Sequence, residues 1–194
     1  MFILGKKVKM SQVWQNDKVV PVTVIKAEPN KVSNIRTKEK HGYEAVQIEG
    51  GKNRREFKIK SSDPAIQASS FKVNDMIDVS AFTEGDLVKI TGFSKGRGFQ
   101  GVVKRHGFHG GPKTHGQKNR HRAPGSIGST AFQRVVPGRR MAGHMGMEKV
   151  SLKNVKVIQI DKENNILMVK GAVPGMNRSF VMISKIAKSL KVKS

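Results

Sequence analysis

The sequence predicts a mainly β protein, built as a small β-barrel body with a long, irregular, basic extension inserted in it. Two observations carry this prediction. Short apolar or alternating segments, bounded by Gly, Pro, Asn or Asp, recur before residue 90 and again after residue 150, as is typical of strands. Between them, the 61 residues from Leu87 to Met147 contain no Asp or Glu, but 12 Lys or Arg, five of the six His and 13 of the 20 Gly.

The first part of the body, residues 1–90, contains five short segments of strand character. They are rich in Val and Ile or alternate apolar with polar residues: Val19 to Ile25, Glu44 to Ile48, Glu56 to Lys60, Met76 to Val79 and Leu87 to Ile90. Several short strands separated by turn residues favour a closed or nearly closed β structure. Between the third and fourth segments, Asp63 to Asn74 begins with Asp-Pro and contains Ala65, Ile66 and Phe71, which predicts one or two helical turns.

The strand pattern resumes in residues 150–194, which we expect to return to the body. Val155 to Ile160 and Ile166 to Val173 are apolar and flank the polar segment Asp161 to Asn165, so they predict a β-hairpin with a longer loop. The last residues, SKIAKSLKVKS, fit either an amphipathic turn through Ile186 and Leu190 or a loose basic tail. Because chain ends are usually poorly ordered, the tail is the favoured interpretation.

Residues 91–149 have the composition of an extended arm rather than of a globular domain. Unopposed positive charges repel one another, and Gly supplies no apolar surface to bury. Ordering about 60 residues costs roughly 60–120 kcal/mol of backbone entropy, which the few large apolar side chains of this segment cannot offset. A partner outside the chain must therefore order the arm, and a dense array of phosphates matches its charge best.

The composition of the whole chain agrees with a nucleic-acid partner. The 37 Lys and Arg outnumber the 14 Asp and Glu, which gives a formal net charge of +23. The chain has no Cys, which excludes disulfide scaffolds and thiolate metal sites. At the amino terminus, MFILGKKVKM has only four apolar residues before Lys6 and Lys7, too few for a signal peptide or a membrane span, so we expect a soluble protein without a membrane partner.

One motif in the arm invites an enzymatic interpretation. Residues 96–101, GRGFQG, fit the G-x-G-x-x-G pattern of dinucleotide folds and kinase glycine-rich loops, and they follow a predicted strand. The context argues against both, because no long helical pattern follows and no carboxylate appears before Glu148 to hold a ribose. The chain also lacks the H-R-D and D-F-G elements of kinases.

The histidines of the arm invite a metal or hydrolase interpretation. His106, His109 and His115 lie close together, but no Cys or carboxylate is near enough in sequence to complete a metal shell, and the adjacent cations oppose metal binding. Ser126 and Ser129 likewise lack an acidic partner for a catalytic triad. We therefore predict no catalytic residue, no metal, no cofactor and no small-molecule substrate.

The candidate RNA-binding residues are the cationic and imidazole side chains of the arm, interleaved with Gly, Pro and Phe. Gly lets backbone amides approach phosphates, Arg can bind them with two donors, and Phe93, Phe99, Phe108 or Phe132 can wedge against bases or sugars. The predicted contacts are Lys95, Arg97, Lys104, Arg105, His106, His109, Lys113, His115, Lys118, Arg120, His121, Arg122, Arg134, Arg139, Arg140 and His144. The plainer alternative is a disordered charged linker, but a linker has no use for Phe, Met and Pro at irregular spacing.

A second basic cluster lies in the body, in a strand-like setting. It comprises Lys52, Arg54, Arg55, Lys58 and Lys60. Such a cluster either protects the exposed edge of a sheet or contacts RNA, and the sequence leaves both open.

Several longer motifs resemble those of one family. GFSKGRGFQGVVKRHGFHGGPKTHG, HRAPGSIGS, GRRMAGHMG and ILMVKGAVPG follow one another in the chain, and ILGKKVKMSQVW and VPVTVIKAEPN precede them. In this order they closely resemble the signatures of universal large-subunit ribosomal protein three, the L-three family, in its bacterial or organellar form. The resemblance covers nearly the whole chain and makes the two amino-terminal motifs its first and second strands.

The resemblance implies a structural, non-enzymatic constituent of the large ribosomal subunit, in the cytoplasm or in an organelle. It implies a β-barrel body at the ribosome surface and an arm that runs through rRNA toward the peptidyl transferase centre, with Ser129 to Arg140 at the tip as a brace. It further implies binding early in subunit assembly, near the 3′ domain of the rRNA, beside proteins of the L-fourteen and L-nineteen families.

The chain departs from the family pattern at a few positions. It has Lys9-Met10 where Gly-Met is common, and Ser11 and Trp14 at the usual Thr and Phe positions. The tip STAFQRVVPGRR is one residue shorter than usual and lacks Thr-Pro-Gly, so the glutamine methylation of some relatives is not carried over to Gln133. Outside the family, the alternative function is an architectural protein that binds duplex DNA through the same charge.

Overall fold

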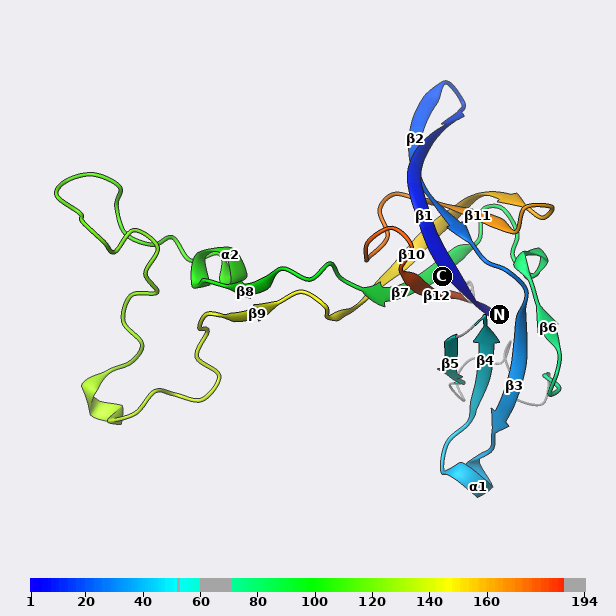
Figure 1. Cartoon of the computed structure of the whole chain (residues 1–194), viewed down its shortest axis with the longest axis horizontal. Helices are drawn as coiled ribbons and strands as arrows, with labels where there is room; N and C mark the ends of the chain where they lie inside the picture. Colours follow the sequence, from blue (N-terminus) through cyan, green and yellow to red (C-terminus); the bar gives the residue numbers. More distant parts are fainter. Residues whose placement is uncertain (52, 60–70, 187–194) are drawn as a thin grey trace, which may run out of the picture. The chain divides into compact units, whose positions relative to one another are not determined.

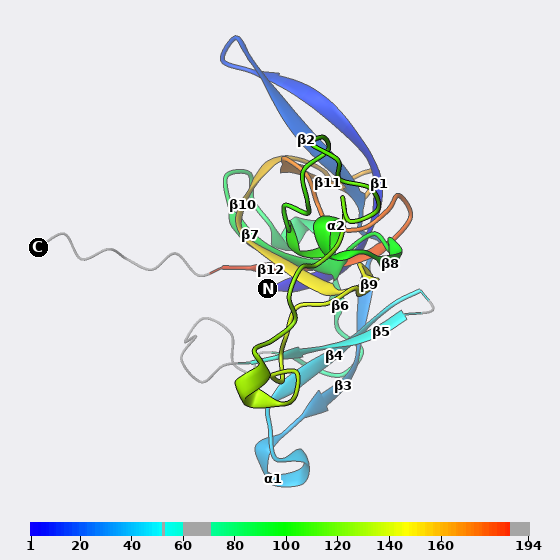
Figure 2. The ribbon, with the colours of Figure 1, turned by 90° about the vertical axis from the view of Figure 1, so that its left-hand side faces the viewer.

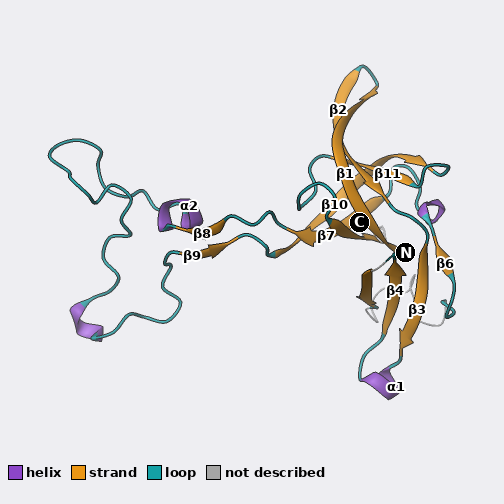
Figure 3. Cartoon of the chain, viewed as in Figure 1, coloured by secondary structure: helices purple, strands orange, loops and turns teal. Residues whose placement is uncertain are grey.

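The computed structural model describes residues 1–51, 53–59 and 71–186, and strands make up most of its regular structure (Figure 3). The chain divides into two compact units. The body consists of residues 1–94 together with the chain from Lys149 onward, and the arm unit consists of Lys95–Glu148. The mainly β fold class is thereby confirmed.

The body contains strands from both ends of the chain (Figure 1). They are β1 (Phe2–Gln15), β2 (Lys18–Lys26), β3 (Asn30–Arg36), β4 (Ala45–Gly50), β5 (Asn53–Lys58), β6 (Met76–Ile77), β7 (Leu87–Phe93), β10 (Lys149–Asp161), β11 (Ile166–Lys170) and β12 (Phe180–Lys185). In the described part of the body, two short helical segments accompany them, α1 (Lys38–His41) and the 3-10 helix η2 (Val79–Ala81). In the part of the chain that the structure describes, no helix is long and apolar enough to cross a membrane.

Six strands pair in a closed ring, in the order β1-β12-β7-β10-β11-β2, and β2 pairs again with β1. Every pairing in the ring is antiparallel. A closed ring leaves no unpaired edge strand, which is the usual way in which small β proteins avoid edge-to-edge association. The other strands form an antiparallel sheet in the order β5-β4-β3-β6, and β3, β4 and β5 lie side by side in Figure 2.

The ring encloses an apolar core drawn from alternate residues of its strands. Successive side chains of a strand point to opposite faces, so each strand contributes every second residue. Fully buried members include Ile3, Ile25, Ile90, Leu167 and Ile183. At about 25 cal/mol per Å² of apolar surface, this burial is the main stabilising term of the body.

Strand β1 explains how the ring is joined to the four-stranded sheet. Ile3 belongs to the ring core, whereas Phe2 and Leu4 point the other way into a second cluster with residues such as Val46 and Ile48. The Phe2 ring stacks on Phe57 of β5, with 4.5 Å between ring centroids. The apolar run FIL is therefore continuous because both faces of β1 are buried at this point.

Most of the predicted strands are confirmed. Val19–Ile25 lies in β2, Leu87–Ile90 in β7 and Val155–Ile160 in β10, and β10 pairs with β11 as the predicted hairpin. Glu44 lies just before β4, and the described part of Glu56–Lys60 lies in β5 or follows it.

Three predicted boundaries are wrong. The segment Met76–Val79 is a strand only as far as Ile77, because Asp78 accepts a hydrogen bond from the Ser80 N–H at 2.8 Å and caps the 3-10 helix that starts at Val79. The strand predicted to reach Val173 ends at Lys170, since Gly171 has a φ of 80°. Residues 91–93 and 149, assigned to the arm, pair in the ring as parts of β7 and β10.

Two other predictions fall wholly or partly outside the described residues. Of the predicted helical turn Asp63–Asn74, only residues 71–74 are described, and they contain no helix. Of the carboxyl-terminal segment, described as far as Ile186, Ser184 and Lys185 end strand β12. The tail from residue 187 onward lies outside the description.

Candidate nucleic-acid interface

The arm unit has a backbone framework of its own. Strands β8 (Gly98–Gln100) and β9 (Gly143–Met145) form an antiparallel pair, with Phe99 opposite His144. Helix α2 (Val102–His106) follows β8, and the 3-10 helix η3 (Thr130–Phe132) lies midway along the unit. Loops make up the rest of it (Figure 3). These elements were not predicted, since their three to five residues are too short for an apolar periodicity.

Helix α2 is tied to the chain that returns from the far half of the arm unit. Arg105 Nη1 donates to the carbonyl oxygen of Met141 at 2.7 Å, and His106 Nε2 lies 3.0 Å from the same oxygen. Because a carbonyl oxygen only accepts, the Nε2 of His106 must carry the proton in this contact. Two side chains of one helical turn thus hold a residue 35 or more positions away.

A second internal contact closes the loop between Gly110 and His121. The Gly111 N–H donates to the His121 carbonyl oxygen at 3.0 Å, and His121 Nδ1 lies 2.9 Å from the Pro112 carbonyl oxygen. Gly110 has a φ of 76°, and a Cβ there would lie 2.0 Å from the His121 oxygen. Only Gly allows the two segments to approach this closely.

The arm unit has almost no core. Of residues 95–148, all of which are described, Val102 alone is buried. The side chains of Phe99 and Phe132 are 75% and 65% exposed. Short hydrogen-bonded contacts therefore shape this unit, with little apolar burial to stabilise it.

The predicted contact residues fall into two groups. Thirteen of the sixteen are exposed: Lys95, Arg97, Lys104, His109, Lys113, His115, Lys118, Arg120, Arg122, Arg134, Arg139, Arg140 and His144. The other three, Arg105, His106 and His121, are half-buried, and they are the three whose side chains bond to Met141 or Pro112 as described above. Arg139, although exposed, also donates from Nη2 to the Ser126 carbonyl oxygen.

The charge of the arm unit is strongly one-sided. Its eleven Lys and Arg face a single carboxylate, Glu148, at its last position. Within the described residues, no group of three or more His, Cys, Asp or Glu is arranged to hold a metal ion. The chemistry that this surface offers is the binding of anions by exposed cations and backbone amides.

The second basic cluster lies on an edge strand. Arg54, Arg55 and Lys58 belong to β5, which pairs with β4 alone among the described strands, while Lys52 and Lys60 lie outside the description. Arg54 Nε forms an ion pair with Glu49 at 3.1 Å, and Lys58 Nζ lies 5.2 Å from the centroid of the Tyr43 ring. This position fits protection of a sheet edge, and RNA contact stays a hypothesis.

Two aromatic side chains of the body stand out, Phe93 and Phe180, and the sequence analysis missed Phe180. Phe93 and Phe180 are 47% and 42% exposed, although they lie at the ends of ring strands β7 and β12. Phe93 was predicted to contact bases or sugars as part of the arm but belongs to the body, and Phe180 begins a strand that was not predicted. The register of the ring strands brings cations beside both side chains, which makes them candidates for contact with a partner.

Comparison with known proteins shows which sequences this chain resembles. Residues 5–165 match the family model described as "Ribosomal protein L3". Similar chains named "Large ribosomal subunit protein uL3" occur in Dehalococcoides mccartyi, at 45% identity, and in Herpetosiphon aurantiacus, at 44% identity. The alignments cover 96% and 97% of this chain, respectively, and 98% of each relative. A third, from Streptomyces avermitilis, is 42% identical over 96% of both chains. The chain therefore belongs to the ribosomal protein L3 family.

Proposed function

We propose that this protein is a structural constituent of the large ribosomal subunit and that the arm unit binds large-subunit rRNA. The observation that supports the proposal most is the arm unit itself, with eleven Lys and Arg, one carboxylate and one buried side chain. A unit with so little core gains its remaining order from a partner, and phosphates suit its charge. The relatives' name, which places them in the large subunit, points to rRNA as that partner.

The roles of the two groups of arm residues differ in this proposal. The thirteen exposed cations and imidazoles contact phosphates, sugars and bases, whereas Arg105, His106 and His121 maintain the shape of the arm unit that presents them. Arg105 and His106 each donate one N–H to the Met141 carbonyl oxygen. The remaining guanidinium donors of Arg105 stay available to RNA. The arm tip, Ser129 to Arg140, braces RNA near the peptidyl transferase centre without taking part in chemistry.

The same proposal covers assembly and neighbours. By its family resemblance, the protein joins the large subunit early, near the 3′ domain of the rRNA, in the cytoplasm and beside proteins of the L-fourteen and L-nineteen families. Its function is non-enzymatic. Binding free energy is released only when the arm unit is ordered on RNA, which fits a component that joins while the RNA is still folding.

Co-sedimentation with large subunits at high salt tests the proposal. We expect the protein to remain with the subunit after a wash that removes loosely bound basic proteins, because an arm enclosed by RNA dissociates slowly. Release at moderate salt would contradict the proposal.

Competition between nucleic acids separates rRNA binding from the alternative of an architectural duplex-DNA protein. We expect a folded fragment of large-subunit rRNA to displace duplex DNA at much lower concentration than the reverse. Equal competition would favour the DNA-binding alternative, since an interface that recognises charge alone does not distinguish strongly between an RNA duplex and a DNA duplex.

A further inference from the structure

A pocket lies in the body where one end of the ring meets edge strand β5. Its apolar wall includes Leu4 and Met182 from adjacent ring strands, together with the rings of Phe93 and Phe180. Arg55 of β5 and Lys149 of β10 add two cations to the lining, whose other members are Asn53, Thr91, Gly92 and Ser179. Apolar rings and cations therefore face one small space.

The register of the ring strands brings these residues together. Strand β7 lies between β10 and β12, with Phe93 opposite Lys149 and with Gly92 opposite Val181, the neighbour of Phe180. The backbone hydrogen bonds of the ring thus fix the backbone of the lining residues that belong to ring strands, and β5 is held by its own pairing with β4. A pocket held in this way is preformed, so a ligand need not order it at an entropic cost.

The phenylalanine side chains of the pocket are more exposed than the stability of the six-stranded ring requires. Phe93 and Phe180 are 47% and 42% exposed, while neighbouring Thr91 and Val181 are buried. Large apolar side chains that stay partly in water beside a pocket contribute little to folding and offer a surface to a partner.

The charges around the pocket are positive. No carboxylate is among its lining residues, and within the described part of the chain neither Arg55 nor Lys149 forms a salt bridge. A third cation, Lys6, holds its Nζ 5.8 Å from the centroid of the Phe180 ring. A ligand that fits must therefore combine a flat ring with a negative group.

We propose that this pocket binds one unpaired nucleotide of RNA, with its base against Phe93 or Phe180 and its phosphate near Arg55 and Lys149. Each RNA residue joins one flat base to one phosphate through a short sugar, which matches a pocket of aromatic rings rimmed by cations. The inference rests on the proposed rRNA binding and adds a nucleotide site on the body. An acidic peptide with an aromatic side chain has similar chemistry, and the tests below distinguish it.

Photocrosslinking of the full-length protein tests the placement of the base. The probe is a short oligoribonucleotide that carries 5-iodouridine, which couples on irradiation to aromatic side chains in direct contact. We expect mass spectrometry to find crosslinked peptides that contain Phe93 or Phe180, alongside any from the arm unit. Crosslinks confined to residues 95–148 would overturn the pocket assignment and leave the proposed function intact, whereas no binding of RNA at all would overturn both.

Paired variants then test the contribution of the aromatic rings. We compare the affinity for an oligoribonucleotide with that for an abasic oligomer carrying the same phosphates. Because base stacking on an aromatic ring is worth about 1–3 kcal/mol, the double variant Phe93→Leu and Phe180→Leu should lose at least about 5-fold of the preference for the base-bearing oligomer. The control Trp14→Leu, which removes a side chain 69% exposed on the body, should keep that preference.

A second pair of variants tests the cations. Arg55→Gln with Lys149→Gln should weaken both oligomers more than Lys9→Gln with Lys18→Gln, which removes the same charge from exposed positions of β1 and β2. Equal weakening by the two pairs would contradict a phosphate site in the pocket. In intact large subunits, a crosslink from a photoreactive group at residue 93 or 180 to a protein instead of RNA would assign the pocket to a peptide and overturn the nucleotide proposal.

Discussion

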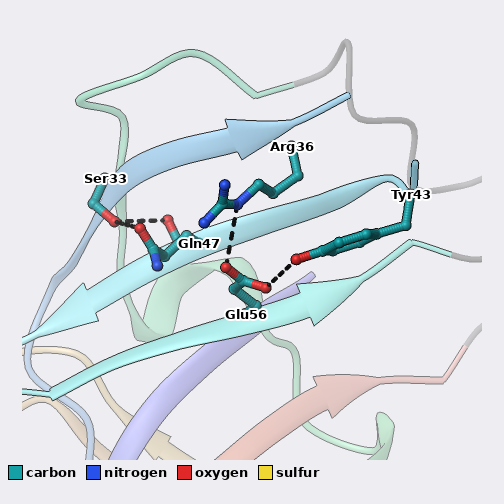
Figure 4. A network of polar contacts seen from close by, with 5 residues as sticks. All are labelled: Ser33, Arg36, Tyr43, Gln47 and Glu56. Carbon is teal, nitrogen blue, oxygen red and sulfur yellow. Dashed lines mark hydrogen bonds and ion pairs between the residues drawn. The ribbon is translucent and has the colours of Figure 1, made fainter. Parts of the chain in front are cut away.

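At the scale of single residues, a polar network on the four-stranded sheet shifts the pKa of its tyrosine. The Tyr43 hydroxyl donates to Glu56 Oε2 at 2.9 Å, and Arg36 Nε forms an ion pair with Glu56 Oε1 at 3.3 Å (Figure 4). Ser33 Oγ also donates to Gln47 Oε1 at 3.1 Å. The hydrogen bond to Glu56 raises the pKa of Tyr43 above its ordinary value, and burial and the negative charge of Glu56 add to it, while Arg36 opposes it.

Since the chain contains a single Tyr, the ultraviolet absorbance of its phenolate follows this one group. We expect Glu56→Gln to lower the pH at which Tyr43 ionises, whereas Glu49→Gln, which removes a charge from the neighbouring strand, should leave it nearly unchanged. The raised pKa means that the folded protein holds the phenolic proton more tightly. Its contribution to stability is therefore present below the ordinary tyrosine pKa of about 10 and is lost as pH rises through the raised value. An unchanged midpoint in Glu56→Gln would contradict this assignment.

Lys7 is a buried cation with a structural role. Its side chain is almost fully inside the body, and Nζ donates to the carbonyl oxygens of Val173 and Gly175 at 2.8 and 3.1 Å. These bonds fix the loop between β11 and β12 to β1. No sequence pattern indicated this role, because Lys6, Lys7 and Lys9 look alike in a basic chain.

We expect Lys7→Met to lower the free energy of unfolding of the body by about 1–3 kcal/mol, because two buried carbonyl oxygens would lose their charged donor. Lys9→Met is the matched control, since Lys9 is exposed on the same strand. Chemical denaturation monitored by circular dichroism gives both values. Equal stability of the two variants would show that water replaces the lost donor.

At the scale of elements, apolar patterns predicted four of the six ring strands, β2, β7, β10 and β11, but not all of the strands. Strand β3 was not predicted because its residues are mostly polar. Its first residue, Asn30, is buried and forms hydrogen bonds with the backbone of Leu4. Strand β12 was not predicted although Val181 and Ile183 alternate in it. Strand β12 pairs with β1 and β7, and Asn30 of β3 bonds to Leu4, so both strands have partners distant in the sequence that no local pattern reveals.

The elements of the arm unit depend on glycines at defined positions. A Cβ at Gly110 would lie 2.0 Å from a backbone oxygen, whereas Gly116, with nearly the same positive φ, has no atom within 4 Å of such a Cβ. Gly110→Ala and Gly116→Ala therefore share the cost of a left-handed backbone and differ only in the clash.

We expect Gly110→Ala to break the bond from the Gly111 N–H to His121 and to accelerate amide exchange at Gly111. Gly116→Ala should leave the exchange of Gly111 close to that of the wild type. Exchange measured by NMR across residues 95–148 makes the comparison. The same exchange rate at Gly111 in both variants would mean that this contact does not hold the loop.

At the scale of the whole molecule, charge distribution predicted a candidate surface but not the internal structure beneath it. Thirteen predicted residues are exposed, as a basic surface requires. The roles of Arg105, His106 and His121 within the arm could not be predicted, because their acceptors are backbone carbonyls that carry no sequence signature. Composition gives the number of charges in a segment. Only the structure shows which of those side chains already have hydrogen-bond partners within the protein.

The two units should respond differently when arm charge is removed. If the arm unit engages about 10 phosphates, the logarithm of the affinity for rRNA should fall against the logarithm of salt concentration with a slope of roughly −7 to −9. Arg120→Gln and Arg122→Gln should each reduce the steepness by about 1, because each exposed guanidinium accounts for one phosphate. Lys18→Gln, a body cation outside the predicted surface, should leave the slope unchanged.

Thermal unfolding completes this test, because the same variants should leave the stability of the body unchanged. The ring core contains no residue of the arm unit, so Arg120→Gln and Arg122→Gln should unfold at the temperature of the wild type. A marked drop in that temperature would mean that these arginines stabilise the fold of the body rather than bind RNA. A slope near zero in the wild type would instead remove phosphate binding as the source of affinity, and with it the reason for so basic an arm.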